Sequence, residues 1–193
     1  MPLDCIWVDI DYADGKKYFV WDKKQFPSPH DMLSLVKQHK RRLVTIVDPH
    51  VKVDESYFLY KIAKQRGLLV KTDEGSDYIA KCWPGDSVWL DFTNPLTTEL
   101  LTEIYTGFHA EEMEDFIWTD AWVHIWNDMN EPAVFEPTDK TFPKGNLHYG
   151  NVEHRDIHNV YGHDNAKATY KALAKRGNMR PFVLTRSFYA GTQ

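Results

Sequence analysis

The chain has 193 residues, of which 42% are hydrophobic and 14% aromatic, and its formal net charge is -5. This length suffices for one domain with a sizeable core or for a piece of a larger domain. The two signs of charge are mixed without a basic stripe, which excludes nucleic acid as an expected partner. No apolar run approaches the roughly 20 residues that span a bilayer, so we expect no membrane partner either.

Hydrophobic periodicity predicts strands that alternate with helices along the whole chain. The expected strands cover residues 3–8, 43–47, 122–126 and 182–185. The expected helices cover residues 30–40, 54–66, 94–106 and 164–176. Strands separated by helices are typical of βα units, so the pattern predicts an α/β fold with a parallel sheet.

Capping residues mark the expected helix ends. Asp54 is the expected N-cap of the second helix. The third helix has the clearest signals, because Asn94 is a good cap, Pro95 fits a first turn and Gly107 suits a left-handed end. The pair 164–165, Asp-Asn, is expected to cap the last helix.

Two segments do not follow this alternation. Residues 68–93 contain a Gly-rich turn and a loop at 82–85 that we expect to present Trp83. Residues 136–163 are expected to form a polar loop, far longer than the usual connection of about 4 to 6 residues. Loops of this size are usually functional or disordered.

The cysteines and the histidines of the long loop are interpreted as structural groups. Cys5 and Cys82 are expected to be buried thiols, because two cysteines cannot define a disulfide framework. His154, His158 and His163 would need a helix to align a His-x₃-His pair on zinc, and the local pattern predicts a loop. Hydrogen bonding is therefore the favoured role for these three side chains.

Every predicted strand is followed by a charged residue. These residues are Asp9, Asp48, Asp128 and Arg186. The carboxyl ends of parallel strands face a shared crevice or barrel mouth, so we expect the four to converge on an active site. The alternative is that strand exits simply favour polar residues.

The exit of the third strand is the most polar of the four. Asn127, Asp128, Asn130 and Glu131 follow an apolar run, and Pro132 prevents the backbone from continuing in regular form. A carboxylate held in one geometry beside aromatic rings is what a nucleophilic Asp needs. The alternative is that Asp and Asn here only cap a turn.

Several acids at one mouth, with aromatic rings nearby, fit glycoside hydrolysis. That reaction needs a carboxylate nucleophile and a carboxylic acid roughly 5 to 5.5 Å away when configuration is retained. Asp128 is the natural nucleophile, and Arg186 would hold it ionised and bind sugar hydroxyls. Exposed aromatic rings stack well on sugars, although seven Trp and ten Tyr also fit a large aromatic core.

Two other chemistries match the sequence less well. The Asp9-x-Asp11 pair after a strand is similar to Mg²⁺-dependent enzymes with an aspartyl nucleophile, but the expected Thr or Val after Asp11 is missing. A calcium loop on Asp9, Asp11 and Asp14 has one residue too many and lacks a bidentate Glu at the right distance.

Four stretches carry a family resemblance. The run 126–135, WNDMNEPAVF, closely resembles the nucleophile signature of family 31 glycoside hydrolases, the α-glucosidase family. Residues 6–12, 46–50 and 181–187 match further family motifs in the same order. The loop 148–162 is most similar to the glucosidase II group, endoplasmic reticulum enzymes that trim glucose from N-glycans. The resemblance covers essentially the whole chain.

The resemblance implies a (β/α)₈ barrel, with about four of the eight strands in this chain, and a retaining mechanism without metal or organic cofactor. Asp128 matches the nucleophile that forms a covalent glucosyl intermediate. Asp9 matches the acid that binds the terminal glucose hydroxyls, and Arg186 the arginine at the same sugar. Asp48 is expected to support the same mouth. The matched glucose-pocket positions are Ile46, Trp83, Trp126, Met129 and Phe135.

The resemblance also makes residues 1–193 part of a catalytic barrel domain. It places the proton-donating Asp on the next strand, beyond Gln193, and the first strand before Met1. An open half-barrel exposes unpaired strand edges, so we expect the isolated chain to be poorly soluble and inactive.

The implied partners are an α-glucoside oligosaccharide or N-glycan substrate and a noncatalytic β subunit. The implied compartment is the endoplasmic reticulum lumen, although the chain carries no recognisable targeting signal. The alternative function is a noncatalytic carbohydrate-binding or interaction remnant, in which Asp9 and Arg186 bind sugar without turnover.

Overall fold

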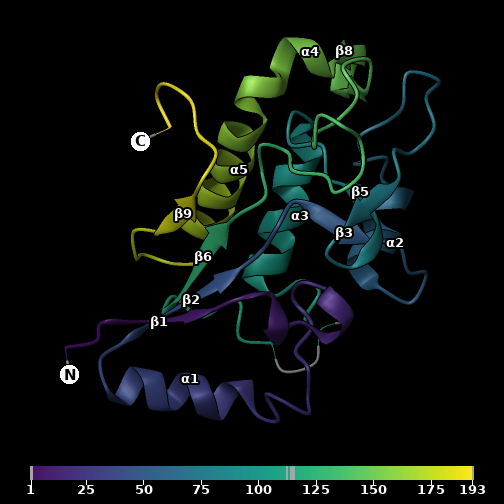
Figure 1. Cartoon of the computed structure of the whole chain (residues 1–193). Helices are drawn as coiled ribbons and strands as arrows, with labels where there is room; N and C mark the ends of the chain where they lie inside the picture. The colour runs from purple at the N-terminus through teal and green to yellow at the C-terminus, as the bar shows by residue number, and fades with distance from the viewer. Residues whose placement is uncertain (1, 112, 114–115, 193) are drawn as a thin grey trace.

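The computed structural model describes residues 2–111, 113 and 116–192. Its main sheet has four parallel strands, which lie side by side in the order in which they follow along the chain (Figure 1). They are β1 (Cys5–Val8), β2 (Arg42–Ile46), β6 (Val123–Asn127) and β9 (Val183–Thr185). The predicted α/β fold with a parallel sheet is therefore confirmed.

The register of the sheet brings the strand exits to one edge. Val8 lies opposite Thr45, and Ile46 lies opposite Trp126. Asn127, the last residue of β6, lies opposite Thr185, the last residue of β9. The residues that follow these strands therefore leave the sheet at the same carboxyl edge.

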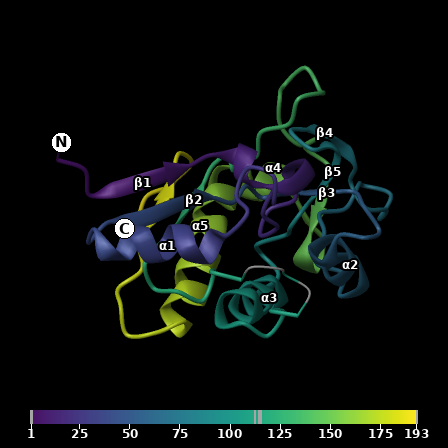
Figure 2. The ribbon, with the colours of Figure 1, turned by 90° about the horizontal axis from the view of Figure 1, so that it is seen from below.

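Three longer helices cover the main sheet. They are α1 (Pro29–Gln38), α3 (Pro95–Thr106) and α5 (Tyr161–Lys175). The α1 helix lies beside β1 and β2 (Figures 1 and 2), while α3 and α5 pack against each other and α5 also contacts β6 and β9. Apolar side chains of α3 and α5, such as Leu100, Ile104 and Ala172, are fully buried between the helices and the sheet.

A second sheet is inserted between β2 and α3. Its strands are β3 (His50–Lys52), β5 (Gly85–Trp89) and β4 (Ala80–Cys82), and all its pairings are antiparallel. Together with α2 (Phe58–Gln65), it forms one end of the molecule in Figures 1 and 2. These strands have three to five residues, too short for a clear periodicity, so the sequence did not predict them. Trp83 lies in the turn between β4 and β5 and is 49% exposed, as expected.

The predicted caps of α3 are confirmed, but the cap of α2 is not. The Asn94 side chain accepts a hydrogen bond from the Leu96 amide, and Gly107 ends α3 in the left-handed conformation. Asp54 does not cap α2, because this helix begins at Phe58 and Tyr57 holds the N-cap position. Its carboxylate accepts instead from the amide and hydroxyl of Ser56, at 2.8 and 2.6 Å, because a tight turn comes before the helix.

The long loop contains more structure than the sequence indicated. It holds β7 (Leu147–His148), β8 (Val152–Glu153) and the short helix α4 (His154–Ile157). The last helix, α5, begins at Tyr161, so the pair 164–165 lies inside it and does not cap it. The long helix begins early because 3-10 turns at 149–151 and 158–160 lead the chain into it.

The two cysteines differ in their exposure to solvent. Both thiols are free, but only Cys82 is buried; Cys5 is exposed because β1 is an outer strand of the sheet. The prediction of two buried thiols was therefore wrong for Cys5. Within the described part of the chain, no helix has both the length and the apolar character needed to cross a bilayer.

Candidate active site

Asp128 and Arg186 leave adjacent parallel strands at the same edge of the sheet. Nη1 of Arg186 lies 3.1 Å from Oδ2 of Asp128, whose side chain is 13% exposed. Partial burial raises the pKa of Asp128, and the guanidinium beside it acts in the opposite direction. The ion pair therefore holds a largely enclosed carboxylate in one orientation, which is the arrangement a nucleophilic Asp requires.

Glu131 completes this ion pair, although it was not among the expected site residues. Its two carboxylate oxygens accept from Nε and Nη2 of Arg186, at 2.6 and 3.1 Å. The same Nη2 lies 3.2 Å from Sδ of Met129. Two parallel bonds fix the plane of the guanidinium. The sequence signal for Glu131 is its position three residues after Asp128 in the same polar strand exit.

Asn130 joins the elements that carry Asp128 and Arg186. It is fully buried, and its Nδ2 donates to Oδ1 of Asn165 at 3.0 Å and to Oγ1 of Thr185 at 2.9 Å. Asn165 belongs to α5, and Thr185 is the last residue of β9, directly before Arg186. One buried amide thus ties the exit of β6 to α5 and to the exit of β9.

Aromatic rings from different segments pair near these strand exits. Trp126 of β6 and Trp7 of β1 have ring centroids 5.3 Å apart. Trp83 and Phe135 have centroids 4.8 Å apart, and the Phe135 amide donates to the carbonyl of Lys81 in β4. Trp83 and Phe135 are both partly exposed, at 49% and 38%. Exposed rings of this kind present apolar faces on which a sugar ring can stack.

Ile46, another expected pocket residue, lies inside the sheet. It ends β2 and is only 2% exposed. Its carbonyl accepts a hydrogen bond from the hydroxyl of Tyr12 at 3.1 Å. Ile46 therefore supports the floor beneath the strand exits.

Asp48 lies two residues beyond β2 and is buried. The hydroxyl of Tyr18 donates to its Oδ2. Burial raises the pKa of Asp48 to about 7; the Tyr18 bond and the charge of Arg186 lower it, while the negative charges of Asp128 and Asp9 raise it. The four charged strand-end residues thus form one electrostatic cluster.

Asp9 is an exposed member of this cluster. Its carboxylate accepts from the Ile10 amide at 2.7 Å and so caps the 3-10 turn Ile10–Tyr12 that follows β1. The structure therefore brings Asp9, Asp48, Asp128 and Arg186 to one edge of the sheet, as the sequence predicts.

The histidines of the long loop form hydrogen bonds. Nδ1 of His148 lies 2.9 Å from Oδ1 of Asp91, and its Nε2 lies 3.0 Å from Nδ1 of His154. Nε2 of His154 lies 2.8 Å from Nδ1 of His158, and His163 pairs with Thr192. No group of three or more His, Cys, Asp or Glu side chains suited to a metal ion was found among the described residues.

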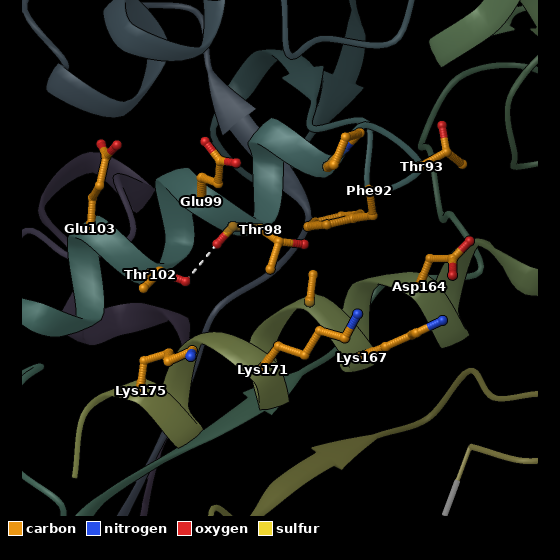
Figure 3. Close-up of a pocket in the computed structure, with 12 residues that line it drawn as sticks. Phe92, Thr93, Thr98, Glu99, Thr102, Glu103, Asp164, Lys167, Lys171 and Lys175 are labelled. Atoms are coloured by element: carbon orange, nitrogen blue, oxygen red, sulfur yellow. Dashed lines mark hydrogen bonds between the residues drawn. The ribbon is translucent and has the colours of Figure 1, made fainter.

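A large groove lies on the helix side of the molecule and has no strand-end residue in its lining. It has a volume of about 840 Å³ and runs between α3 and α5 (Figure 3). The α3 side carries Glu99 and Glu103, and the α5 side carries Lys167, Lys171 and Lys175. The groove is therefore separate from the cluster at the carboxyl edge.

Comparison with known proteins agrees with this geometry. The family model described as "Glycosyl hydrolases family 31 TIM-barrel domain" matches residues 1–193. Neutral alpha-glucosidase C of Macaca fascicularis is 46% identical over 195 residues, which cover 100% of this chain and 25% of that protein. Glucosidase 2 subunit alpha of Schizosaccharomyces pombe is 47% identical over 195 residues, with 100% and 20% covered.

A solved structure has the same fold over the full chain. It is the ER glucosidase II heterodimeric complex, consisting of the catalytic subunit and the binding domain of the regulatory subunit. The similarity has a TM-score of 0.92 at 46% identity and covers 100% of this chain and 21% of that chain. The chain thus spans about a fifth to a quarter of the length of the relatives it matches. These matches show that the chain belongs to glycosyl hydrolase family 31 and forms part of its TIM-barrel domain.

Proposed function

We propose that residues 1–193 are part of the catalytic barrel of a retaining α-glucosidase and that Asp128 is its nucleophile. The observation that supports this proposal most directly is the ion pair between Asp128 and Arg186 at adjacent strand exits, with Oδ2 and Nη1 3.1 Å apart. The guanidinium keeps the carboxylate ionised and aimed, so that it can attack an electrophilic carbon. The names of the relatives supply the substrate class, an α-glucoside.

The reaction proceeds in two displacements. A carboxylate oxygen of Asp128 bonds to the anomeric carbon as the bond to the leaving oxygen breaks, and that oxygen takes a proton from a carboxylic acid. We place this acid on the next strand, outside residues 1–193. Water then attacks the anomeric carbon, loses a proton to the same acid group and releases glucose and the Asp128 carboxylate.

The remaining site residues have distinct roles in this proposal. Asp9 and Arg186 bind hydroxyls of the terminal glucose, and Asp48 supports the charge at the mouth. Trp83 and Phe135 flank the entrance as stacking surfaces, since both are partly exposed. Trp126 and Met129 line the pocket beside the nucleophile, and Ile46 forms part of its floor.

The open sides of the sheet support the placement within a larger barrel. β1 and β9 are the outer strands, so each has one edge without a strand partner among the described residues. A groove of about 850 Å³ lies beside β9, lined in part by Tyr170, Phe182 and Val183. Tyr170 and Phe182 are nearly half exposed there, which suits an apolar surface that another βα unit covers.

We infer the finer assignment from the relatives. Their names include a glucosidase 2 α subunit and an ER complex with a regulatory subunit. The proposed substrate is therefore an N-glycan that carries terminal glucose, the compartment is the endoplasmic reticulum lumen, and the partner is a noncatalytic β subunit. The test is copurification of such a subunit and release of glucose from a glucosylated N-glycan.

The central test uses the protein expressed from its complete coding sequence, called the expressed enzyme below. Asp128→Asn should lower kcat for an aryl α-glucoside by at least about 10³-fold, because an amide cannot form the glycosyl ester. A mechanism-based inhibitor should add one sugar to the peptide that contains Asp128. Asp73→Asn, at an exposed turn position, is the matched control.

Sugar binding without turnover or labelling would instead identify a noncatalytic carbohydrate-binding remnant. Turnover that survives Asp128→Asn would refute the assignment of the nucleophile. Both outcomes are distinguishable from loss of the fold by the thermal midpoint of each variant.

A further inference from the structure

A chain of buried hydrogen bonds leads to Asp48. The hydroxyl of Tyr18 donates to Oδ2 of Asp48 and lies 2.9 Å from Nε2 of His50. Nδ1 of His50 lies 3.3 Å from Sγ of Cys82. All four side chains are at least nine-tenths buried. They come from the strand exit of β2, the segment after the first 3-10 turns, β3 and β4.

The chemistry of the donors gives this chain one direction. A phenol has a single proton, and here Tyr18 gives it to Asp48, so Nε2 of His50 must be the donor to the Tyr18 oxygen. Burial lowers the pKa of His50 to about 3, so the ring is neutral and its Nδ1 is an acceptor. Burial also raises the pKa of the Cys82 thiol to about 12, so this thiol keeps the proton that it donates.

This direction matters because, among the described residues, no lysine or arginine bonds directly to Asp48. The guanidinium of Arg186 is bonded to Asp128 and Glu131. The other oxygen of Asp48, Oδ1, is buried and has no hydrogen-bond partner among the described residues. The Tyr18 hydroxyl is therefore the donor that stabilises the Asp48 carboxylate, and His50 keeps that hydroxyl pointed at it.

We propose that Tyr18 and His50 are positioning residues of the glycosidic reaction, which act through Asp48 by holding its carboxylate ionised and in one orientation. This inference rests on the proposed function. The transition state of glycoside cleavage carries positive charge on the sugar ring. A fixed negative charge at the strand exits stabilises that charge without any reorganisation during the reaction.

The groups that face Asp48 determine how its ionisation responds to pH. Tyr18 donates to it, and Nε2 of the neutral His50 ring lies 2.9 Å from the Tyr18 hydroxyl and 3.6 Å from Oδ2 of Asp48. The charged groups that act on it come from the exits of the other three strands; they are Asp9, Asp128 and Arg186. The Tyr18 bond lowers the pKa of Asp48, so removing the hydroxyl raises it and reduces the ionised fraction at neutral pH.

The test compares four variants of the expressed enzyme. Tyr18→Phe removes the donor to Asp48, and His50→Leu removes the group that orients this donor. His50→Gln keeps an N–H near the position of Nε2 and is the conservative variant. Tyr161→Phe is the matched control, because it is equally buried and its hydroxyl donates at 2.8 Å to the backbone carbonyl of Leu90, outside the cluster.

The expected result is a pH-dependent loss of kcat. Tyr18→Phe should lower kcat at pH 7 by about tenfold, the size of one hydrogen bond to a charged group, and should leave KM within about threefold. The acidic limb of its pH profile should move upward by about one pH unit, so that activity recovers as the pH rises. His50→Leu should shift the limb in the same direction, and His50→Gln should restore most of the activity.

Unchanged acidic limbs in both Tyr18→Phe and His50→Leu would overturn the positioning role, as would losses that match those of Tyr161→Phe at every pH. If Tyr18→Phe does not fold, as judged by its thermal midpoint, the two His50 variants decide the question. Absence of α-glucosidase activity in the expressed enzyme without substitutions would overturn the proposed function and this inference together. If the expressed enzyme is active and this activity depends on Asp128, but the Tyr18 and His50 variants keep its pH profile, the inference alone would be overturned.

Discussion

Arg186 follows β9 and Asp128 follows β6, and their side chains meet with Nη1 and Oδ2 3.1 Å apart. The same guanidinium binds Glu131 through Nε and Nη2. One cation thus organises two carboxylates from a single polar turn. The relationship makes the fork shape of the guanidinium, and not only its charge, a requirement of the site.

Arg186→Lys should therefore impair the expressed enzyme strongly. A lysine keeps the positive charge but cannot bond Asp128 and Glu131 in the same plane, so we expect kcat/KM to fall by about 10²-fold. Steady-state kinetics on an aryl α-glucoside measures the effect. Arg155→Lys, at a more exposed arginine that pairs with Glu153, is the matched control. Equal activity of the two variants would show that the site does not require the forked geometry of the Arg186 guanidinium.

Gly162→Ala should destabilise the contact between α5 and the segment after β9. An added Cβ would clash with Oγ of Ser187 and would lie 2.7 Å from the backbone carbonyl oxygen of Asn130. Overpacking of this kind typically costs about 1–3 kcal/mol of the free energy of unfolding. Gly177→Ala is the control, because nothing lies within 4 Å of its added Cβ. Denaturant unfolding of both variants measures the difference, and equal midpoints would contradict the prediction.

The Asn130–Asn165 pair should show direct coupling in a double-mutant cycle. Asn130→Ala leaves Oδ1 of Asn165 without this donor, and Asn165→Ala removes one of the acceptors of the Asn130 amide, so each single variant should lose about 1–3 kcal/mol of stability. The double variant should lose less than the sum of the two. Asn159→Ala, at an exposed position, serves as the control. Strict additivity would mean that the two amides do not interact in solution.

Asp48→Asn should raise stability, and more so at high pH. In the folded protein burial raises the pKa of Asp48 from its ordinary 3.8 to about 7. Between these two values the folded state binds more protons than the unfolded state, so stability falls as pH rises. The amide removes this dependence and still accepts from Tyr18. The gain in the free energy of unfolding should be small at pH 4 and about 1–4 kcal/mol at pH 8.

The check on Asp48→Asn is a series of denaturant unfolding curves from pH 4 to pH 8. Activity should fall in the same variant, because the carboxylate charge is lost. A gain in stability that does not change with pH would show that packing, and not ionisation, is responsible. Asp73→Asn again provides the exposed control.

The parts of the fold that the sequence revealed depend on local signals. Asn94, Pro95 and Gly107 define α3 because caps act on their own helix, and the apolar runs of β2 and β6 are clear because nearly all of their residues are buried. The small antiparallel sheet was missed because β3 and β4 have three residues each. The start of α5 was missed because α4 and two 3-10 turns lead into it without a side-chain cap.

The site shows the same division. Asp9, Asp48, Asp128 and Arg186 were predictable because each follows an apolar strand, and parallel strands share a carboxyl edge. Glu131 was not assigned to the site, because the sequence does not show that its carboxylate pairs with Arg186, 55 residues further along the chain. The Tyr18–His50–Cys82 chain has no local signal at all, since contacts 32 residues apart create it.

The strand order of the main sheet has a consequence for biosynthesis. Since β1, β2, β6 and β9 are neighbours in the order of translation, β2, β6 and β9 each pair with a strand that has already left the ribosome. The sheet can therefore form one strand at a time during synthesis. On the growing side, only the last strand has an unpaired edge, and the next strand covers it.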